Sequence, residues 1–277
     1  MDFSLAEADL SSELKTRWDA LLDRFCQFGS VIVAFSGGID SGLLCAAGWR
    51  ALGPKMLAVT VRSPIESAGD VASAHALSAQ IGFPLRLLEY DDLDNPLFVS
   101  NPPNRCYVCK LARFQLLQSL AAAEGFMALV EGSNADDLRD YRPGSQAVSE
   151  LGVFSPLQEL GFAKSEIRAL SKSLGLCIWD RPSAPCLATR FPYGSPISAA
   201  GLRQVAEGER YLHELGFQTV RVRHHGQLAR IEVIDDDIER LVGLRQQISV
   251  FFQSLGFHYV AADLSGYRLG SLNEVLK

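Results

Sequence analysis

Long apolar runs are missing from this 277-residue sequence, and the longest, such as "VIVAF" at 31–35, are far too short to span a bilayer. The opening segment, "MDFSLAEADLSSELKTRW", has no basic stretch followed by an apolar one, so a signal peptide is not expected. Positive residues are fewer than negative ones: the chain has 26 Lys and Arg and 32 Asp and Glu, which gives a net charge of -6. This balance offers no general attraction to nucleic acid or anionic membranes. We therefore expect a cytoplasmic protein. We expect neither nucleic acid nor a membrane as its partner.

Cysteine is also sparse. The six cysteines are expected to be reduced, metal-binding or catalytic in the cytoplasm, rather than paired in disulfides. Internal repeats and low-complexity tracts are absent. The proportions of hydrophobic residues (48%) and charged residues (21%) are those of an ordinary globular protein, and the chain is long enough for two domains.

What the sequence does contain is an alternation of apolar, strand-like runs with helical patterns. The expected strands are 31–35, 56–61, 85–90 and 126–132, and the expected helices are 4–28, 41–52, 66–82, 108–124 and 164–175. This order predicts an α/β fold, with a parallel sheet covered by helices on both faces. In such sheets, ligands bind at the carboxyl ends of the strands.

A proline-rich stretch, "DRPSAPCLATRFPYGSPIS" at 180–198, precedes a different order of elements. Helices are expected at 198–215 and 236–254, and strands at 218–223, 228–234 and 257–262. Adjacent strands flanked by helices predict a smaller α+β domain. The expected domains are therefore 1–195 and 196–277.

The strongest motif follows the first strand directly and reads "SGGIDS". Two glycines let backbone N–H groups approach an anion, and the next helix adds its positive N-terminal end. Asp40 could hold a magnesium ion between phosphates. The pattern is neither a Walker A loop nor G-x-G-x-x-G. It closely resembles the phosphate loop of the N-type ATP pyrophosphatases, which implies ATP binding by Ser36, Gly37, Gly38, Asp40 and Ser41.

A second motif, "EGSNADD" at 131–137, follows the fourth strand and therefore reaches the same edge of the sheet. It resembles the G-[ST]-N-x-x-D segment of the same superfamily. We expect Gly132, Asn134 and Asp136 near the nucleotide, with Val61 at the end of the second strand. "DYRPG" follows, and its Arg142 could meet an anionic ligand or lie in a surface loop.

Cys106 and Cys109 form a CxxC pair in "NPPNRCYVCK". A structural zinc site needs four ligands, and the sequence has no second CxxC or histidine pair at ligand spacing nearby. A thioredoxin-like redox pair would follow a first strand rather than the third. Cys186, in "SAPCLATR", lies beside Arg190 in a loop suited to a reactive thiolate. Cys26, Cys45 and Cys177 have apolar neighbours and are expected in the core.

The remaining three thiols, Cys106, Cys109 and Cys186, could hold a 4Fe–4S cluster with one iron left open. From the spacing alone, it is equally possible that these three cysteines occur in this arrangement by chance. The combination of "SGGIDS", "NPPNRCYVCK", "EGSNADD", "DYRPG", "CLATRFPYG" and "TVRVRHHGQLARIE", in this order, resembles the LarE family of ATP-dependent sulfur transferases. The resemblance runs from about residue 20 to the end of the chain.

The LarE resemblance implies a reaction. ATP and Mg²⁺ adenylate a carboxylate of pyridinium biscarboxylic acid mononucleotide, and sulfur then displaces AMP to give a thiocarboxylate. The product leads to the nickel-pincer nucleotide cofactor of lactate racemase. In one branch the sulfur comes from a single cysteine, matched here by Cys186. In the other, three cysteines bind a 4Fe–4S cluster, and Cys106, Cys109 and Cys186 match this branch.

The C-terminal domain offers positive charge for the substrate. In "TVRVRHH", strand alternation places Arg221, Arg223 and His225 on one face. The family resemblance implies that these arginines and Arg190, with Glu209 nearby, receive the substrate phosphate. A solvated outer face of the sheet explains the pattern equally well. The resemblance also implies a homo-oligomer.

Two other enzymes could combine these features. A tRNA thiolation enzyme of the superfamily would carry a basic face, which the acidic balance of this chain argues against. An ammonia-using adenylating ligase would not need the three cysteines. A nucleotide-binding regulator would bind ATP without releasing pyrophosphate.

Overall fold

The computed structural model describes residues 10–139, 143–182, 185–268 and 270–276. By its internal contacts, the chain divides into two compact units. The first unit comprises 1–63, 68–90 and 106–184, and the second comprises 64–67, 91–105 and 185–277. The domain boundary expected near residue 195 stays a prediction. None of the described helices is long and apolar enough to cross a bilayer.

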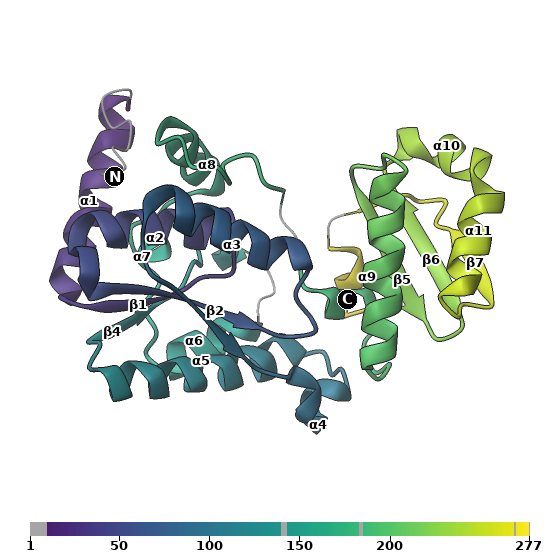
Figure 1. The fold of residues 1–277 in the computed structure, drawn as a ribbon, viewed down its shortest axis with the longest axis horizontal. Coiled ribbons are helices and arrows are strands. Elements are labelled where there is room, and N and C mark those ends of the chain that lie inside the picture. The colour runs from purple at the N-terminus through teal and green to yellow at the C-terminus, as the bar shows by residue number, and fades with distance from the viewer. Residues whose placement is uncertain (1–9, 140–142, 183–184, 269, 277) are drawn as a thin grey trace. The chain divides into compact units, whose positions relative to one another are not determined.

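The first unit contains a four-stranded sheet in which every neighbouring pair is parallel (Figure 1). In spatial order its strands are β3 (Leu85–Glu89), β2 (Met56–Arg62), β1 (Val31–Ala34) and β4 (Ala128–Val130). Their carboxyl ends therefore meet at one edge, and the predicted α/β fold is confirmed. The bounds of all four strands agree with the expected ranges to within two residues.

Helices cover both faces of this sheet, with α2 and α3 on one side and α5 and α6 on the other (Figure 1). The helices of the first unit are α1 (Ser12–Phe28), α2 (Ile39–Leu52), α3 (Ala68–Ile81), α5 (Arg105–Glu124), α6 (Pro143–Glu150), α7 (Pro156–Glu159) and α8 (Lys164–Ser173). The unit division places Arg105 itself in the second unit, so α5 begins there and continues into the first.

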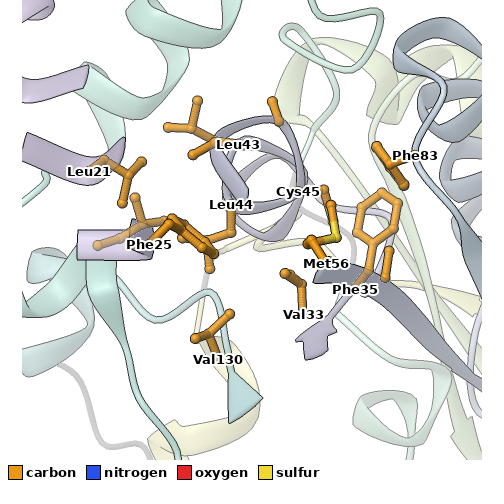
Figure 2. Packing of buried hydrophobic residues seen from close by; sticks show 14 of the residues in the cluster. Leu21, Phe25, Val33, Phe35, Leu43, Leu44, Cys45, Met56, Phe83 and Val130 are labelled. Carbon is orange, nitrogen blue, oxygen red and sulfur yellow. The ribbon is translucent and has the colours of Figure 1, made fainter. Parts of the chain in front are cut away.

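Two apolar clusters hold these layers together, one on each face of the sheet. Val31 and Val33 belong to the cluster under α1 and α2, whereas Ile32 belongs to the cluster under α5. Neighbouring strand residues thus face opposite layers, as a parallel sheet buried on both sides requires. Figure 2 shows Phe25 of α1 and Leu44 of α2 among the side chains of the first cluster. Each large apolar side chain buried this fully contributes about 1.5–3 kcal/mol.

The three cysteines expected in the core have different environments. Cys45 is fully buried in the first cluster (Figure 2), and burial raises the pKa of its thiol well above the ordinary value. For Cys26 and Cys177 the prediction was wrong, because both are exposed. Cys26 lies on α1, whose apolar face is formed instead by Trp18, Leu21 and Phe25.

The start of α1 is set by a cap. The helix was expected from residue 4, but residue 10 lies outside it, and Ser11 accepts a hydrogen bond from the backbone N–H of Leu14 through its hydroxyl. A serine in this position satisfies an N–H that the helix itself leaves unpaired. Residues 4–9 lie outside the described part of the chain.

The second unit contains a mixed three-stranded sheet. Strand β6 (Leu228–Val233) lies in the middle, antiparallel to β5 (Val220–His225) and parallel to β7 (Tyr259–Ala262). The helices of this unit are α4 (Pro96–Val99), α9 (Ala199–Glu214), α10 (Ile238–Gly243) and α11 (Arg245–Ser254). A Cβ added to Gly208 of α9 would lie 2.9 Å from the Phe252 ring of α11 and 3.5 Å from Val222 of β5. These elements are therefore closely packed around one core.

Two elements of this unit differ from the expectation. The single helix expected at 236–254 is interrupted, because it starts with a 3-10 turn at Asp235–Asp237 and breaks at Leu244, directly after Gly243. Glycine has a low helix propensity, so a break there costs little. The strand expected at 218–223 begins instead at Val220, since Gln218 and Thr219 form a bend.

Candidate active site

The "SGGIDS" loop connects β1 to the N-terminus of α2 in the first unit. The hydroxyl of Ser41 accepts from the Ser36 backbone N–H at 3.2 Å and lies 3.0 Å from the Ser36 hydroxyl. Gly38 precedes the helix, and none of the side chains that the structure describes caps it. The first N–H groups of α2 are therefore left for a ligand, as at the anion sites that helix N-termini form. The loop fits a phosphate group.

Gly37 is the tightest point of this loop. It has a φ of 75°, and a Cβ on it would lie 2.2 Å from the backbone oxygen of Asp70. The guanidinium of Arg181 donates to the Gly37 carbonyl at 2.5 Å and to the Asp70 carboxylate at 2.7 Å. Arg181 thus ties the loop to α3. Our sequence analysis did not find this residue, since a single arginine in a proline-rich stretch has no distinguishing pattern.

Asp40, the expected magnesium ligand, forms an ion pair in this structure. The ammonium of Lys164, at the start of α8, lies 2.5 Å from its Oδ2. The two side chains are 34% and 23% exposed, so the pair is open to solvent and to ligands. Lys164 was also missed by sequence reasoning. It brings a second positive group to the phosphate loop.

The "EGSNADD" segment meets the loop at the expected edge. A Cβ on Gly132 would lie 2.9 Å from the backbone nitrogen of Ser41, so the two predicted nucleotide segments are in close contact. Asn134 is buried, and its side-chain oxygen accepts from the Asp136 N–H at 3.0 Å. Asp136 is exposed and accepts from the backbone N–H of Lys164 at 2.8 Å. In the structure these residues shape the turn and cap α8.

Glu131 is a buried carboxylate beside this segment that the sequence analysis did not single out. It accepts hydrogen bonds from the Ser133 backbone N–H (2.9 Å), the Ser155 hydroxyl (2.7 Å) and the Lys110 ammonium (3.2 Å). Burial by itself would raise the pKa of Glu131. The charge of Lys110 and the two serine hydrogen bonds outweigh that effect and lower the pKa, so the group is an anion at neutral pH.

The CxxC pair lies on the first turn of α5. Cys106 is exposed and Cys109 is partly buried, and their spacing of three residues places both on one helix face. Lys110 follows Cys109 and reaches Glu131, directly after β4. The hydroxyl of Tyr107 donates to Glu150 of α6 at 2.7 Å. The first unit therefore anchors the thiol pair to the sheet edge that carries the phosphate loop.

Val61 and Arg142 remain predictions as site residues. Val61 is partly buried near the end of β2, where it packs against the apolar cluster under α5. Arg142 lies outside the described residues.

Cys186 belongs to the second unit and is partly buried. Its carbonyl accepts from the backbone N–H of Thr189 at 3.0 Å and from the Arg190 guanidinium at 3.1 Å. The structure thus brings together Cys186 and Arg190, as the sequence suggested. Arg190 also donates to the Pro185 carbonyl at 2.6 Å, so its side chain fixes the backbone of the cysteine loop.

Two of the arginines expected to bind the substrate form ion pairs with carboxylates. Arg190 makes a two-point contact with Glu209 at 2.9 and 2.8 Å, and Arg223 makes one with Glu232 at 2.8 and 2.7 Å. All four residues are buried. Buried pairs of this kind need each partner, because removing one leaves an uncompensated charge. In this structure these two ion pairs stabilise the second unit.

Arg221 differs from these two arginines. It donates to the carbonyl of Val220 at 2.7 Å, and its guanidinium lies 5.2 Å from the ring centre of Tyr267. Within the described part of the chain, no carboxylate forms an ion pair with it. Burial, followed by the nearby charge of Arg190, lowers the pKa of Arg221. An arginine in this state is well suited to an anionic ligand.

Over the described ranges, no group of three or more His, Cys, Asp or Glu side chains is arranged to hold a metal ion. Cys106 and Cys109 belong to the first unit and Cys186 to the second.

Comparison with known proteins supplies the family. No family model matches the chain. It is 36% identical over 264 residues to pyridinium-3,5-bisthiocarboxylic acid mononucleotide synthase (LarE) of Lactiplantibacillus plantarum, covering 95% of this chain and 96% of that protein. The chain belongs to the LarE family. This agrees with the resemblance that the ordered motifs carry.

Other relatives extend this LarE relationship. An uncharacterized protein of Synechocystis is 41% identical over 268 residues, which is 95% of this chain and 99% of that protein. A probable tRNA sulfurtransferase of Methanothermobacter thermautotrophicus is 27% identical over 157 residues, covering 53% of this chain and 40% of that protein. The similarity to the tRNA enzyme is therefore partial, whereas the similarity to LarE extends over nearly the whole chain.

Proposed function

We propose that this protein is an ATP-dependent sulfurtransferase that converts a carboxylate of pyridinium biscarboxylic acid mononucleotide into a thiocarboxylate, for the nickel-pincer nucleotide cofactor used by lactate racemase. The observation that carries this proposal is the first unit itself. In it, the phosphate loop and the CxxC pair are both anchored at the sheet edge, the loop through Gly132 and the pair through the Lys110–Glu131 contact. The 36% identity to LarE supports the choice of substrate.

The first chemical step is activation of the carboxylate. Its oxygen attacks the α-phosphorus of ATP, and pyrophosphate leaves with the electron pair of the broken P–O bond. The backbone N–H groups of the loop and the N-terminus of α2 hold the phosphates, so most of the acceleration comes from positioning and charge compensation. When ATP binds, we expect Lys164 to move from Asp40 to a phosphate oxygen. Asp40 then becomes available to Mg²⁺, which prefers carboxylate and phosphate oxygens.

The second step is sulfur insertion. If Cys186 supplies the sulfur, its thiolate attacks the carbonyl carbon of the acyl adenylate, AMP leaves with the electrons of the C–O bond, and a thioester forms. Removal of the Cys186 α-proton then breaks the Cβ–Sγ bond, which releases the thiocarboxylate and leaves dehydroalanine at position 186. We assign Cys106, Cys109 and Cys186 to the sulfur-transfer site and propose that they also hold the 4Fe–4S cluster of the three-cysteine branch. The placement of two thiols on one face of α5 supports this assignment.

Arg221 is the residue we assign to the substrate phosphate, because Arg190 and Arg223 are already paired with Glu209 and Glu232. Arg221→Met should raise the dissociation constant of the mononucleotide by about tenfold to 100-fold, the effect of losing a charge-assisted hydrogen bond. Binding of ATP should not change. Isothermal titration calorimetry with each ligand measures both quantities.

Two other arginines control this prediction. Arg210 is an exposed arginine on α9 that pairs with Glu207 and Glu214 of the same helix, and Arg210→Met should leave both affinities unchanged. Arg223→Met should instead lower the free energy of unfolding by about 3–5 kcal/mol, because it leaves Glu232 buried and unpaired. If Arg221→Met binds the mononucleotide normally, the assignment of Arg221 is wrong.

The reaction itself is tested by two readouts on anaerobically purified protein. Pyrophosphate release should require the pyridinium mononucleotide, and mass spectrometry should find the carboxylate converted to a thiocarboxylate. Parallel reactions with tRNA or with ammonia test the two alternative enzymes. Pyrophosphate release driven by tRNA, or an amide product formed from ammonia, would refute the proposal.

A further inference from the structure

The carbonyl oxygen of Cys186 accepts hydrogen bonds from three donors, all within the second unit. The donors are the backbone N–H of Thr189 at 3.0 Å, the Thr189 hydroxyl at 2.8 Å and Nη1 of Arg190 at 3.1 Å. A carbonyl oxygen has two lone pairs, so three donors exceed what a neutral carbonyl needs. An oxygen that gains negative charge during a reaction is stabilised by such a set of donors.

The local turn explains one of these donors. Residues Leu187–Arg190 form a 3-10 helix that begins directly after Cys186, and the bond from the Thr189 N–H is the ordinary hydrogen bond of such a turn. The Thr189 hydroxyl and the Arg190 guanidinium are additional. All three distances fall in the range of about 2.7–3.1 Å at which donors stabilise an oxyanion.

Other contacts fix the position of Arg190. Its Nε and Nη2 donate to the carboxylate of Glu209 at 2.9 and 2.8 Å, and Glu209 also accepts from the backbone N–H of Val222 at 3.0 Å. Arg190 is 3% exposed. A donor held in place in this way needs no reorganisation when charge develops, and its effect is strong because water is excluded.

Arg190 also acts on the carbonyl through Thr189. Its Nη1 donates to the Thr189 hydroxyl oxygen at 2.9 Å, and this hydroxyl donates to the Cys186 carbonyl. Hydrogen bonds in such a chain strengthen one another. The positive charge therefore reaches the carbonyl both directly and through the hydroxyl.

We propose that Thr189 and Arg190 form an oxyanion site at the carbonyl of Cys186, which stabilises the negative charge that develops there when this residue gives up its sulfur. The inference rests on the proposed function, for the route in which Cys186 supplies the sulfur. Both residues touch the atom that gains the charge, so both are catalytic residues of this step.

The step starts from the thioester between Cys186 and the substrate. Hydroxide from solvent, which reaches this partly buried residue, takes the α-proton and becomes water. The electron pair of the broken Cα–H bond is delocalised onto the carbonyl oxygen, where the three donors compensate its charge. It then forms the Cα=Cβ bond, while the Cβ–Sγ electron pair leaves with the thiocarboxylate.

The elimination is tested without ATP or substrate on cyanylated, metal-free protein. The parent for this test carries Cys106→Ser, Cys109→Ser and Cys177→Ser. The exposed Cys26 and the partly buried Cys186 are then modified with nitrothiocyanatobenzoate. Hydroxide removes the α-proton of each cyanylated residue, thiocyanate leaves with the Cβ–Sγ electron pair, and dehydroalanine remains. Peptide mass spectrometry should find this elimination at least about 100-fold faster at Cys186 than at Cys26.

Thr189→Val removes the hydroxyl and keeps the shape of the side chain. It should slow elimination at Cys186 by about 100-fold, the effect of losing one oxyanion donor, whereas Thr189→Ser keeps the hydroxyl and should keep the rate. Thr16→Val is the matched control, because the Thr16 hydroxyl donates to the Ser12 carbonyl at 3.0 Å in the first unit. Its rate should equal that of the parent. The inference is overturned if Cys186 eliminates no faster than Cys26, or if Thr189→Val eliminates as fast as the parent.

Arg190→Lys provides a second test should Thr189→Val fail to fold. Lysine keeps a positive charge for Glu209 but lacks the planar fork that lets one guanidinium reach both Glu209 and the Cys186 carbonyl. Elimination at Cys186 should slow by about 100-fold or more. A rate equal to that of the parent would also overturn the inference.

An activity measurement separates this inference from the proposed function. With ATP, the mononucleotide and all native cysteines, Thr189→Val should release pyrophosphate normally and accumulate the thioester at Cys186, as detected by intact-protein mass spectrometry. A purely structural defect would slow both steps without accumulating the thioester, which would overturn the inference. Thiocarboxylate formed without loss of the Cys186 sulfur would overturn it as well. If the wild-type protein forms no thiocarboxylate, the proposed function fails, while elimination from the cyanylated protein still decides whether Thr189 and Arg190 form an oxyanion site.

Discussion

Gly37→Ala is expected to reduce ATP-dependent pyrophosphate release by more than about 100-fold, the scale of effect that small misplacements of reacting groups produce. The added Cβ would lie 2.2 Å from the Asp70 carbonyl oxygen, a separation that real side chains do not adopt. Backbone must therefore move, and the Arg181 bonds to Gly37 and Asp70 would be strained in the process. Because the loop N–H groups hold the phosphates, ATP binding should be lost as well, as measured by calorimetry.

Gly29→Ala separates strain from steric conflict. Gly29 has nearly the same φ as Gly37, 74° against 75°, but a Cβ there would have no atom within 4 Å. The variant should therefore lose about 1–2 kcal/mol of stability from its left-handed conformation and keep ATP binding intact. Equal ATP affinity in Gly37→Ala and the wild-type protein would contradict the role assigned to this close approach.

The parallel sheet was predictable because its strands are short apolar runs. In a sheet buried on both faces, consecutive residues such as Val31, Ile32 and Val33 must all be apolar, and no polar alternation confuses the pattern. The glycine pair directly after such a run then locates the phosphate loop at a known edge of the fold. The short helices α6 and α7 were not predicted. Each begins at a proline, Pro143 and Pro156, which sequence analysis more readily assigns to a loop.

The contacts of charged residues were harder to predict from the sequence. Lys164 and Arg181 lie 124 and 144 residues from Asp40 and Gly37, and only the folded chain brings these groups together. Strand alternation correctly placed Arg221 and Arg223 on one face. It could not show that Glu232, on the neighbouring strand, forms an ion pair with Arg223, while no carboxylate in the described ranges forms one with Arg221. Patterns along a chain thus give the face of a residue but not the group that it meets.

Cys186 is the residue whose replacement should reduce sulfur incorporation most. Cys186→Ala should reduce sulfur incorporation by more than about 1,000-fold, as removal of a reacting group does, while pyrophosphate release continues. The carbonyl contacts with Thr189 and Arg190 involve only the backbone, so alanine can retain them. Liquid chromatography of the thiocarboxylate, together with a pyrophosphate assay, measures the two steps separately.

The other cysteines decide which form of the site operates. If the three thiols act together and hold a cluster, Cys106→Ala and Cys109→Ala should lose sulfur incorporation to the same extent as Cys186→Ala, and each should lose the iron and sulfide found in anaerobically purified wild-type protein. Cys177→Ala, an exposed cysteine outside the site, should change nothing. If Cys106→Ala and Cys109→Ala keep full activity and the wild-type protein is free of iron, Cys186 alone supplies the sulfur, and the CxxC pair has no part in the reaction.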